Sequence, residues 1–213
     1  MVTGFVSGPP NQVLMDYARQ LIPRVPAPRV LDLGCGAARN GAPLAELGCR
    51  VVGVDLSEPM LAGARKRVAT SACAERLAFV HGPMSPLPFA DQSFDLVVAH
   101  GIWNLATSDE ALRSSMTETA RVSRPGAGLF LFTFSRDTLS QDAKPVDGQT
   151  VIFDQFAGEP QCFLTEAQVL SELALAGFRR DGDEPLTAYN RPSETQLRSA
   201  GPVIWEGTFV RQD

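Results

Sequence analysis

Short apolar runs alternate with amphipathic segments along most of the chain. Apolar runs of this length are typical of buried strands, whereas apolar residues spaced three and four apart are typical of helices. Because strands that alternate with helices pair in parallel, the pattern predicts an α/β fold with helices on both faces of one sheet. The predicted strands span 29–33, 50–55, 77–81, 94–99 and 129–134.

The helices are predicted from their spacing and from the residues at their ends. Ser57 and Thr165 stand at helix starts, where a side-chain oxygen caps free N–H groups, and Thr107 with Glu110 forms a capping-box pattern. Gly177 stands at a helix end. The predicted helices cover about 11–21, 38–47, 57–68, 107–122 and 165–177, and the closing strands are expected at about 184–190 and 202–210.

Residues 136–162 interrupt this alternation. The segment is polar at first and then carries aromatic residues, among them Phe153 and Phe156. A connection of this length is either a lid or binding loop, or an insertion with a small hairpin, and both remain open here. The predicted domain spans 1–213 and comprises a lead-in over 1–28, a core over 29–134, an insertion over 135–162 and a closing part over 163–213.

Composition and charge narrow the function classes. The 213 residues are 44% hydrophobic and 20% charged, which is ordinary for a globular domain. The net charge of −5 argues against nucleic acid as the main partner, because phosphate binding favours a basic face. No apolar run is long enough to span a membrane and the first residues lack a signal-peptide layout, so a cytoplasmic location is expected. The four cysteines are scattered and no residues have metal-ligand spacing, so neither disulfides nor a metal are expected.

A glycine turn follows the first predicted strand in the stretch RVLDLGCGAARN (29–40). Gly34 and Gly36 can adopt positive φ values and let a ligand approach the backbone. Asp32 lies just before this turn, and Asp55 ends the next strand, about 20 residues further on. Acids at two successive strand ends suit an adenosine that carries a charged tail, with Asp55 accepting hydrogen bonds from the ribose diol.

The residues of the turn favour S-adenosylmethionine (SAM) over NAD. A dinucleotide fingerprint requires a third glycine where Arg39 stands, because helix and strand pack closely there. A pyrophosphate would also be repelled by Asp32, whereas the ammonium group of the SAM tail would be attracted to this carboxylate. The alternative is a strand, turn and helix that bind no ligand.

These stretches resemble the motifs of the class I SAM-dependent methyltransferases. LDLGCGAARN is similar to the first motif, although Ala38 replaces a frequent third glycine; VVGVDLSEPML is similar to the second, and HGPMSPLPFADQSFDLVVAHG to the third and fourth. The likeness runs from about Arg29 to Phe134 and implies a single Rossmann-like, doubly wound, mostly parallel seven-stranded sheet with an antiparallel closing strand. It also implies methyl transfer to a small-molecule acceptor, with S-adenosylhomocysteine (SAH) as product. A narrower likeness to the tellurite-resistance type rests on Arg39 and Asn40.

The resemblance also assigns residues to the cofactor. Pro83 stands where many relatives carry an acid that binds the adenine amino group, so Met84 and its backbone N–H would have to hold the ring. Lead-in helices of the family fold over the site, which implies that Tyr17 reaches the cofactor tail or the acceptor. Cys35 lies between the glycines, where its backbone matters more than its sulfur. The expected cofactor set is Tyr17, Asp32, Gly34, Cys35, Gly36, Asn40, Asp55, Leu56, Pro83, Met84 and His100.

Residues that contact the acceptor are expected after the fourth strand, in AHGIWNLA (99–106). His100 is a candidate general base, because the ordinary pKa of histidine is near neutral, or it contacts the cofactor tail through its backbone. Trp103 and Asn104 are candidates for an aromatic wall and a polar anchor, although Trp103 is equally a packing residue. Arg136 and Tyr189 are further candidates for acceptor contact.

Other functions remain open on these residues. A non-catalytic module that binds SAM or SAH would carry the same motifs, because a cofactor site does not prove turnover. An RNA or protein methyltransferase is disfavoured by the acidic net charge and by the absence of an Asn-Pro-Pro-Tyr motif after the fourth strand. A nucleotide-dependent oxidoreductase is disfavoured by Arg39.

Overall fold

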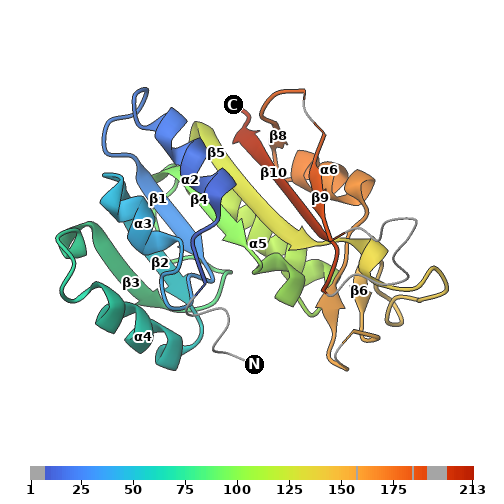
Figure 1. Cartoon of the computed structure of the whole chain (residues 1–213). Helices are drawn as coiled ribbons and strands as arrows, with labels where there is room; N and C mark the ends of the chain where they lie inside the picture. The colour runs from blue at the N-terminus through green and yellow to red at the C-terminus, as the bar shows by residue number, and fades with distance from the viewer. Residues whose placement is uncertain (1–7, 157, 184, 191–200) are drawn as a thin grey trace.

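An eight-stranded sheet forms the centre of this computed structural model, which describes residues 8–156, 158–183, 185–190 and 201–213 (Figure 1). The strands are β1 (Arg29–Leu33), β2 (Arg50–Asp55), β3 (Leu77–His81), β4 (Phe94–His100), β5 (Ser123–Phe134), β8 (Phe178–Arg180), β9 (Thr187–Tyr189) and β10 (Ile204–Arg211). Their order across the sheet is β3-β2-β1-β4-β5-β10-β8, and the remaining strand, β9, also pairs with β10. Neighbours from β3 to β5 pair in parallel, whereas β10 is antiparallel to β5, β8 and β9. This order confirms the predicted mostly parallel, doubly wound sheet with an antiparallel closing strand.

One strand was not predicted, and another begins earlier than predicted. β8 was not expected, because its three residues include a single buried side chain, Phe178, and two arginines. β5 begins at Ser123, earlier than expected, because Ser123 already pairs with Phe94 ahead of a register shift. The two predicted closing strands correspond to β9 and β10, and residue 184 of the first prediction lies outside the described residues.

Helices cover both faces of the sheet because successive strand side chains point in opposite directions (Figure 1). The helices are α2 (Gln12–Leu21), α3 (Gly41–Glu46), α4 (Glu58–Val68), α5 (Asp109–Val122) and α6 (Glu166–Leu175). Val30 of β1 is buried with Leu14 of α2 and Leu44 of α3. Its neighbour Leu31 is buried in a second cluster with Leu112 of α5 and residues of α6. The core therefore consists of two layers separated by the sheet.

Side-chain caps fix where several helices begin. Thr165 caps α6 as predicted, and together with Gln168 it forms a capping box. Ser108, and not Thr107, caps α5, because its hydroxyl oxygen accepts a hydrogen bond from the Ala111 N–H at 3.0 Å and the helix begins at residue 109. Asn11 caps α2. Its side chain also donates to Glu206, so α2 begins beside the carboxyl ends of the parallel strands.

The segment 136–162 contains a short hairpin. Its strands β6 (Ile152–Phe153) and β7 (Gln161–Cys162) pair antiparallel. Val151, Ile152 and Cys162 are buried in the same cluster as α5 and α6. Of the two expectations for this segment, a hairpin is therefore present, and the hairpin is part of the core.

None of the described helices has both the length and the apolar character needed to cross a bilayer. Within the same ranges, no three His, Cys, Asp or Glu side chains gather as a metal-binding group. All four cysteines are described, and each is a buried free thiol.

Candidate cofactor and acceptor site

The turn after β1 forms the centre of the candidate site. Gly34 and Gly36 have φ values of 64° and 52°. A Cβ atom at Gly34 would lie 2.5 Å from Cδ1 of Ile102, so the position accommodates only glycine. Ala38 also has a positive φ, 58°, a conformation that costs an L-residue about 1–2 kcal/mol. The backbone thus keeps the geometry of a third glycine at a position where the sequence has alanine.

Asp55, at the end of β2, joins this turn to the next one. Its Oδ2 accepts a hydrogen bond from the Gly36 N–H at 2.8 Å, and its Oδ1 accepts one from the Ser57 N–H at 2.8 Å. Each carboxylate oxygen has room for a second donor. The half-buried Asp55 can therefore accept from a ribose diol while it fixes both turns.

Asp32 is buried beside the first residue of α3. Its exposed fraction is 2%, and no described residue donates a hydrogen bond to its Oδ2, which would lie 3.3 Å from a Cβ at Gly41. Burial raises the pKa of Asp32 to about 7; the charge of Arg39 opposes this rise and the charge of Asp55 adds to it. A buried acceptor without a donor is costly, so a cationic ligand nearby would be favourable. The residues therefore fit the ammonium-bearing tail of SAM.

The edge beside Asp55 is apolar. Leu56 follows Asp55 directly and is 70% exposed. The Gly82 N–H donates to the backbone oxygen of Asp55 at 3.1 Å, which brings the loop after β3 to the same edge. In that loop Met84 packs on the core cluster, whereas Pro83 is exposed. The adenine ring is predicted at this edge, where the turn with Leu56 meets the loop with Pro83 and Met84.

His100 ends β4 between an aromatic ring and a guanidinium group. Its ring stacks on Phe132, with 4.1 Å between the centroids and 7° between the planes. The Nη2 atom of Arg39 lies 3.2 Å from Nδ1 of His100. Burial, and after it the positive charge of Arg39, lowers the pKa of His100 to about 4. The imidazole is therefore neutral at neutral pH and is a weak base.

Sequence reasoning missed two residues at this edge, Asn11 and Glu206. Glu206 is 2% exposed; its Oε2 accepts from Nδ2 of Asn11 at 2.6 Å and its Oε1 from the hydroxyl of Tyr189 at 2.6 Å. The backbone N–H of Asn11 donates to Oδ1 of Asn40 at 3.0 Å, and Nδ2 of Asn11 lies 3.5 Å from Nε2 of His100. The N-terminal segment therefore links the glycine turn to β10. One sequence signal was present for Glu206, an acid inside the apolar run IWEGTF (204–209).

Tyr17 does not reach this edge, contrary to the expectation from the sequence. Its hydroxyl donates to Oδ2 of Asp181 at 3.0 Å, and its ring lies against Gly128. Gly128 pairs with Leu96, near the start of β4. Because α2 begins at the carboxyl edge and runs toward the opposite edge, Asn11 lies at the site and Tyr17 does not.

The predicted acceptor residues separate into two groups. Trp103 is fully buried, and its indole N–H donates to Oγ of Ser115 at 2.9 Å, so it packs under α5 and forms no pocket wall. Arg136 donates to the backbone oxygen of Ser140 at 2.9 Å and supports the insertion. Asn104 differs from both, because it is 4% exposed and no described residue forms a hydrogen bond with its Oδ1. Asn104 and Tyr189 therefore remain acceptor candidates.

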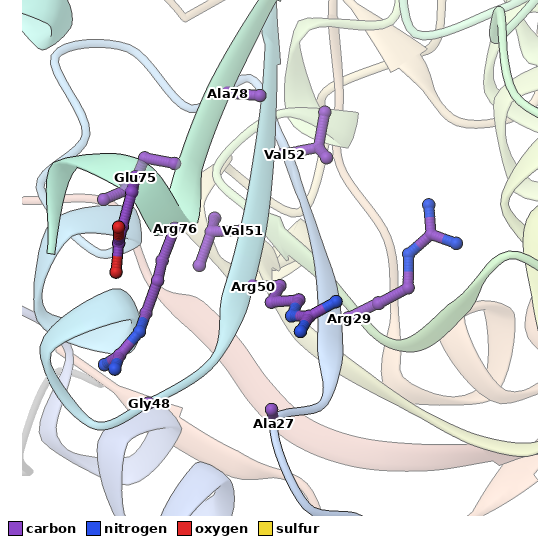
Figure 2. A pocket seen from close by; sticks show the side chains of 10 residues that line it. Ala27, Arg29, Gly48, Arg50, Val51, Val52, Glu75, Arg76 and Ala78 are labelled. Atoms are coloured by element: carbon purple, nitrogen blue, oxygen red, sulfur yellow. The ribbon is translucent and has the colours of Figure 1, made fainter.

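A surface hollow of about 600 Å³ lies at the opposite, amino edge of β1, β2 and β3 (Figure 2). Its lining includes Arg29, Arg50 and Arg76. Figure 2 shows the guanidinium group of Arg76 directed away from those of Arg29 and Arg50. The Arg29 guanidinium lies 5.5 Å from the centroid of the Phe94 ring, and Nη1 of Arg76 donates to the Ala45 oxygen at 3.4 Å. The hollow therefore lacks a convergent basic cradle and is separate from the glycine turn.

Comparison with known proteins agrees with this geometry. Residues 30–126 match the family model described as a methyltransferase domain. A demethylmenaquinone methyltransferase from Clavibacter sepedonicus is 38% identical over 108 residues, which cover 50% of this chain and 41% of that protein. The chain thus matches less than half the length of that curated relative.

Solved structures show the same fold over nearly the whole chain. The 1,6-didemethyltoxoflavin-N1-methyltransferase of Burkholderia thailandensis, solved with its substrate and SAH, has a TM-score of 0.67 and 24% identity and covers 95% of this chain and 80% of its own. The CcbJ methyltransferase of Streptomyces caelestis has a TM-score of 0.70 and 17% identity and covers 100% and 96%. These relatives do not bear on the tellurite-resistance likeness, which stays a prediction. Residues 30–126 thus match a methyltransferase domain, and the whole chain has the fold of these solved methyltransferase structures.

Proposed function

We propose that the protein binds SAM at the glycine turn and catalyses transfer of its methyl group to a small-molecule acceptor. The observation that carries this proposal is the pair of acids around the turn: Asp55 fixes the backbone of Gly36, and Asp32 lies buried with an oxygen that no described residue satisfies. Bound SAM would supply an activated methyl group: a nucleophilic atom of the acceptor would form the new bond to the methyl carbon, the electron pair of the broken methyl–sulfur bond would remain on sulfur to give SAH, and any proton on the attacking atom would be released.

The residues of the chain would bind and orient SAM and the acceptor, and they would exclude water. Asp55 would hold the ribose, Asp32 the ammonium group, and Leu56 with Met84 the adenine face. Residues 8–11 would restrict access of water at the carboxyl edge. In-line displacement at an activated carbon depends mainly on alignment, so no strong catalytic base is required.

His100 would contribute by position more than by proton transfer. Its pKa of about 4 leaves it neutral at neutral pH, which makes it a weak general base there. We therefore propose that His100 contacts the cofactor tail or the acceptor. The attacking atom of the acceptor would be nucleophilic without full deprotonation by the protein.

The relatives support a small molecule as the acceptor. One is named for demethylmenaquinone and another was solved with 1,6-didemethyltoxoflavin, and both names describe organic molecules that are not macromolecules. The acidic net charge of this chain is consistent with such an acceptor and gives no support to nucleic acid. We propose a cytoplasmic location on the same sequence grounds as above.

The proposal is tested by SAH release. The purified protein is incubated with SAM and a panel of small hydroquinones, N–H heterocycles and aliphatic amines, with and without each compound, and SAH is quantified. The expected result is acceptor-dependent SAH formation by the wild type and a loss of at least tenfold in Asp55→Ala. Compound-independent release, or equal rates in both proteins, would contradict a methyltransferase that uses this turn.

A second candidate function is a non-catalytic module that binds SAM or SAH. The observations that favour it are the exposed Pro83, whose side chain offers adenine no hydrogen-bond acceptor, and the weak base at His100. Tight SAH binding without SAH formation for any acceptor in the panel would favour this module.

A further inference from the structure

Three paired strands place His100, Phe132 and Glu206 in one row. Across β4 and β5 His100 pairs with Phe132, and across β5 and β10 Phe132 pairs with Glu206. Residues that face each other on neighbouring strands point to the same side of a sheet. The row therefore lies at the carboxyl end of β4 and β5, on the face that α2 covers.

From His100, this row extends away from Asp55 and the glycine turn. In the order β2-β1-β4-β5-β10, Asp55 ends β2 and the glycine turn follows β1, whereas the row runs from β4 to β10. A nucleoside held by Asp55 would occupy the β2 side of the turn. The row consequently lies on the side where a second molecule could meet the reactive end of the cofactor.

Glu206 is an unusual residue for its position. It is 2% exposed in a strand whose neighbours Ile204, Trp205 and Phe209 are also buried. Its hydrogen-bond partners among the described residues are two neutral donors, Asn11 and Tyr189, and none of the ion pairs there involves it. A buried carboxylate is costly unless a cation or several donors compensate it. A fold that needed only these two hydrogen bonds could use an uncharged residue.

We propose that Glu206 binds the methyl acceptor and that the acceptor is a small molecule with an amine that is protonated at neutral pH. This inference rests on the proposed function. Each oxygen of Glu206 accepts one hydrogen bond and can accept another, so an N–H donor can bind without loss of the contact to Tyr189. A cation is favoured over a neutral hydroxyl because it also compensates the buried negative charge.

Asn11 and Tyr189 define the route to this carboxylate. Both have solvent-accessible surface, whereas Glu206 lies beneath them. The Asn11 amide bonds to the carboxylate and lies next to His100, so its displacement would open the row from the side of the N-terminal segment. Tyr189 would keep the carboxylate in place, and it is a positioning residue.

The test compares amines with alcohols of the same carbon skeleton. SAH-saturated protein is screened with a panel of small primary and secondary amines, each paired with its alcohol, by saturation-transfer NMR. Dissociation constants are then measured for the amines that bind. The variants are Glu206→Gln, which keeps shape and hydrogen-bonding capacity, and Asp181→Asn, which removes one exposed charge at the opposite edge as a matched control.

The expected result is that amines bind the wild type more tightly than their alcohols and that Glu206→Gln weakens amine binding at least tenfold, whereas Asp181→Asn leaves it unchanged. Equal binding of amines and alcohols, no binding of either class, or equal affinity in Glu206→Gln would overturn the proposal. SAH affinity is measured on every protein first. Failure of the wild type to bind SAH would contradict the proposed function, whereas normal SAH binding without an amine preference would contradict only the role of Glu206.

Discussion

At the scale of single residues, two buried acids distinguish this site. Asp32 and Glu206 are each 2% exposed, and each lies at the carboxyl edge of the sheet. Asp32 was predicted from the glycine turn because the motif residues are contiguous in the sequence. Glu206 was not predicted, because its relation to His100 and Asn11 arises only when β10 pairs with β5. Partners that are far apart in the chain are invisible to local patterns.

The pKa of Asp32 predicts a pH-dependent affinity for SAH. Burial raises this pKa from 3.8 to about 7, so the carboxyl is protonated in the free protein below about pH 7. The protonated form contributes stability that is lost as the pH rises through this value. The ammonium group of SAH needs the ionised carboxylate of Asp32. The affinity for SAH should therefore increase about tenfold per pH unit up to about pH 7 and then level off.

Titration calorimetry with SAH between about pH 5.5 and about pH 8 measures this dependence. Asp32→Asn is the matched variant, since it keeps the shape of the side chain and removes the ionisation. Its affinity should be lower at high pH and nearly independent of pH. An affinity of the wild type that does not change over this range would show that Asp32 does not hold the ammonium group.

At the scale of elements, the sequence predicted what local spacing determines. The helix periods and the glycine turn predicted α2 to α6 and β1 to β5 with small shifts at their ends, except that β5 begins six residues earlier than predicted. β8 and the hairpin of β6 and β7 were not placed, because strands of two or three residues carry too few positions for a pattern. The direction of α2 was also missed, since its spacing shows which residues are buried and not which end lies at the site. For that reason Tyr17 was expected where Asn11 lies.

Asn11, the residue before α2, should stabilise the fold because it caps this helix. Oδ1 of Asn11 accepts a hydrogen bond from the Leu14 N–H at 3.0 Å, and Nδ2 donates to Glu206. Serine retains a cap and loses the link to Glu206, whereas alanine loses both. Asn11→Ala should therefore have a free energy of unfolding about 1 kcal/mol lower than Asn11→Ser, measured by urea denaturation. Equal values for the two variants would indicate that the cap contributes nothing.

At the scale of the whole molecule, the two edges of the sheet differ in character. The carboxyl edge gathers the glycine turn, the acids and the start of α2. The amino edge carries a hollow whose arginines do not converge. Ligands of open parallel sheets bind beyond the carboxyl ends of the strands, at the point where the strand order reverses. In this sheet the order reverses between β1 and β4, next to the glycine turn.

Hydrogen exchange should distinguish the two edges. SAH is expected to slow the exchange of backbone amides in the glycine turn, in the turn at residues 55–57 and in the loop at residues 82–84. Amides at the hollow, in residues 48–52 and 75–78, should exchange at the same rate with and without SAH. Protection centred on the amino edge would place the ligand in the hollow and contradict the site described above.

The central claim is that the acids around the glycine turn bind SAM. Isothermal titration of the wild type with SAM, SAH and NAD, repeated on Asp55→Ala, tests it most directly. The account predicts micromolar binding of SAM or SAH, no binding of NAD, and a loss of about 1–3 kcal/mol in the variant, the usual penalty when a buried polar partner is left unmet. A melting curve of the variant shows whether it is folded. Absence of SAM and SAH binding in the wild type, or equal affinity in a folded Asp55→Ala, would contradict the account.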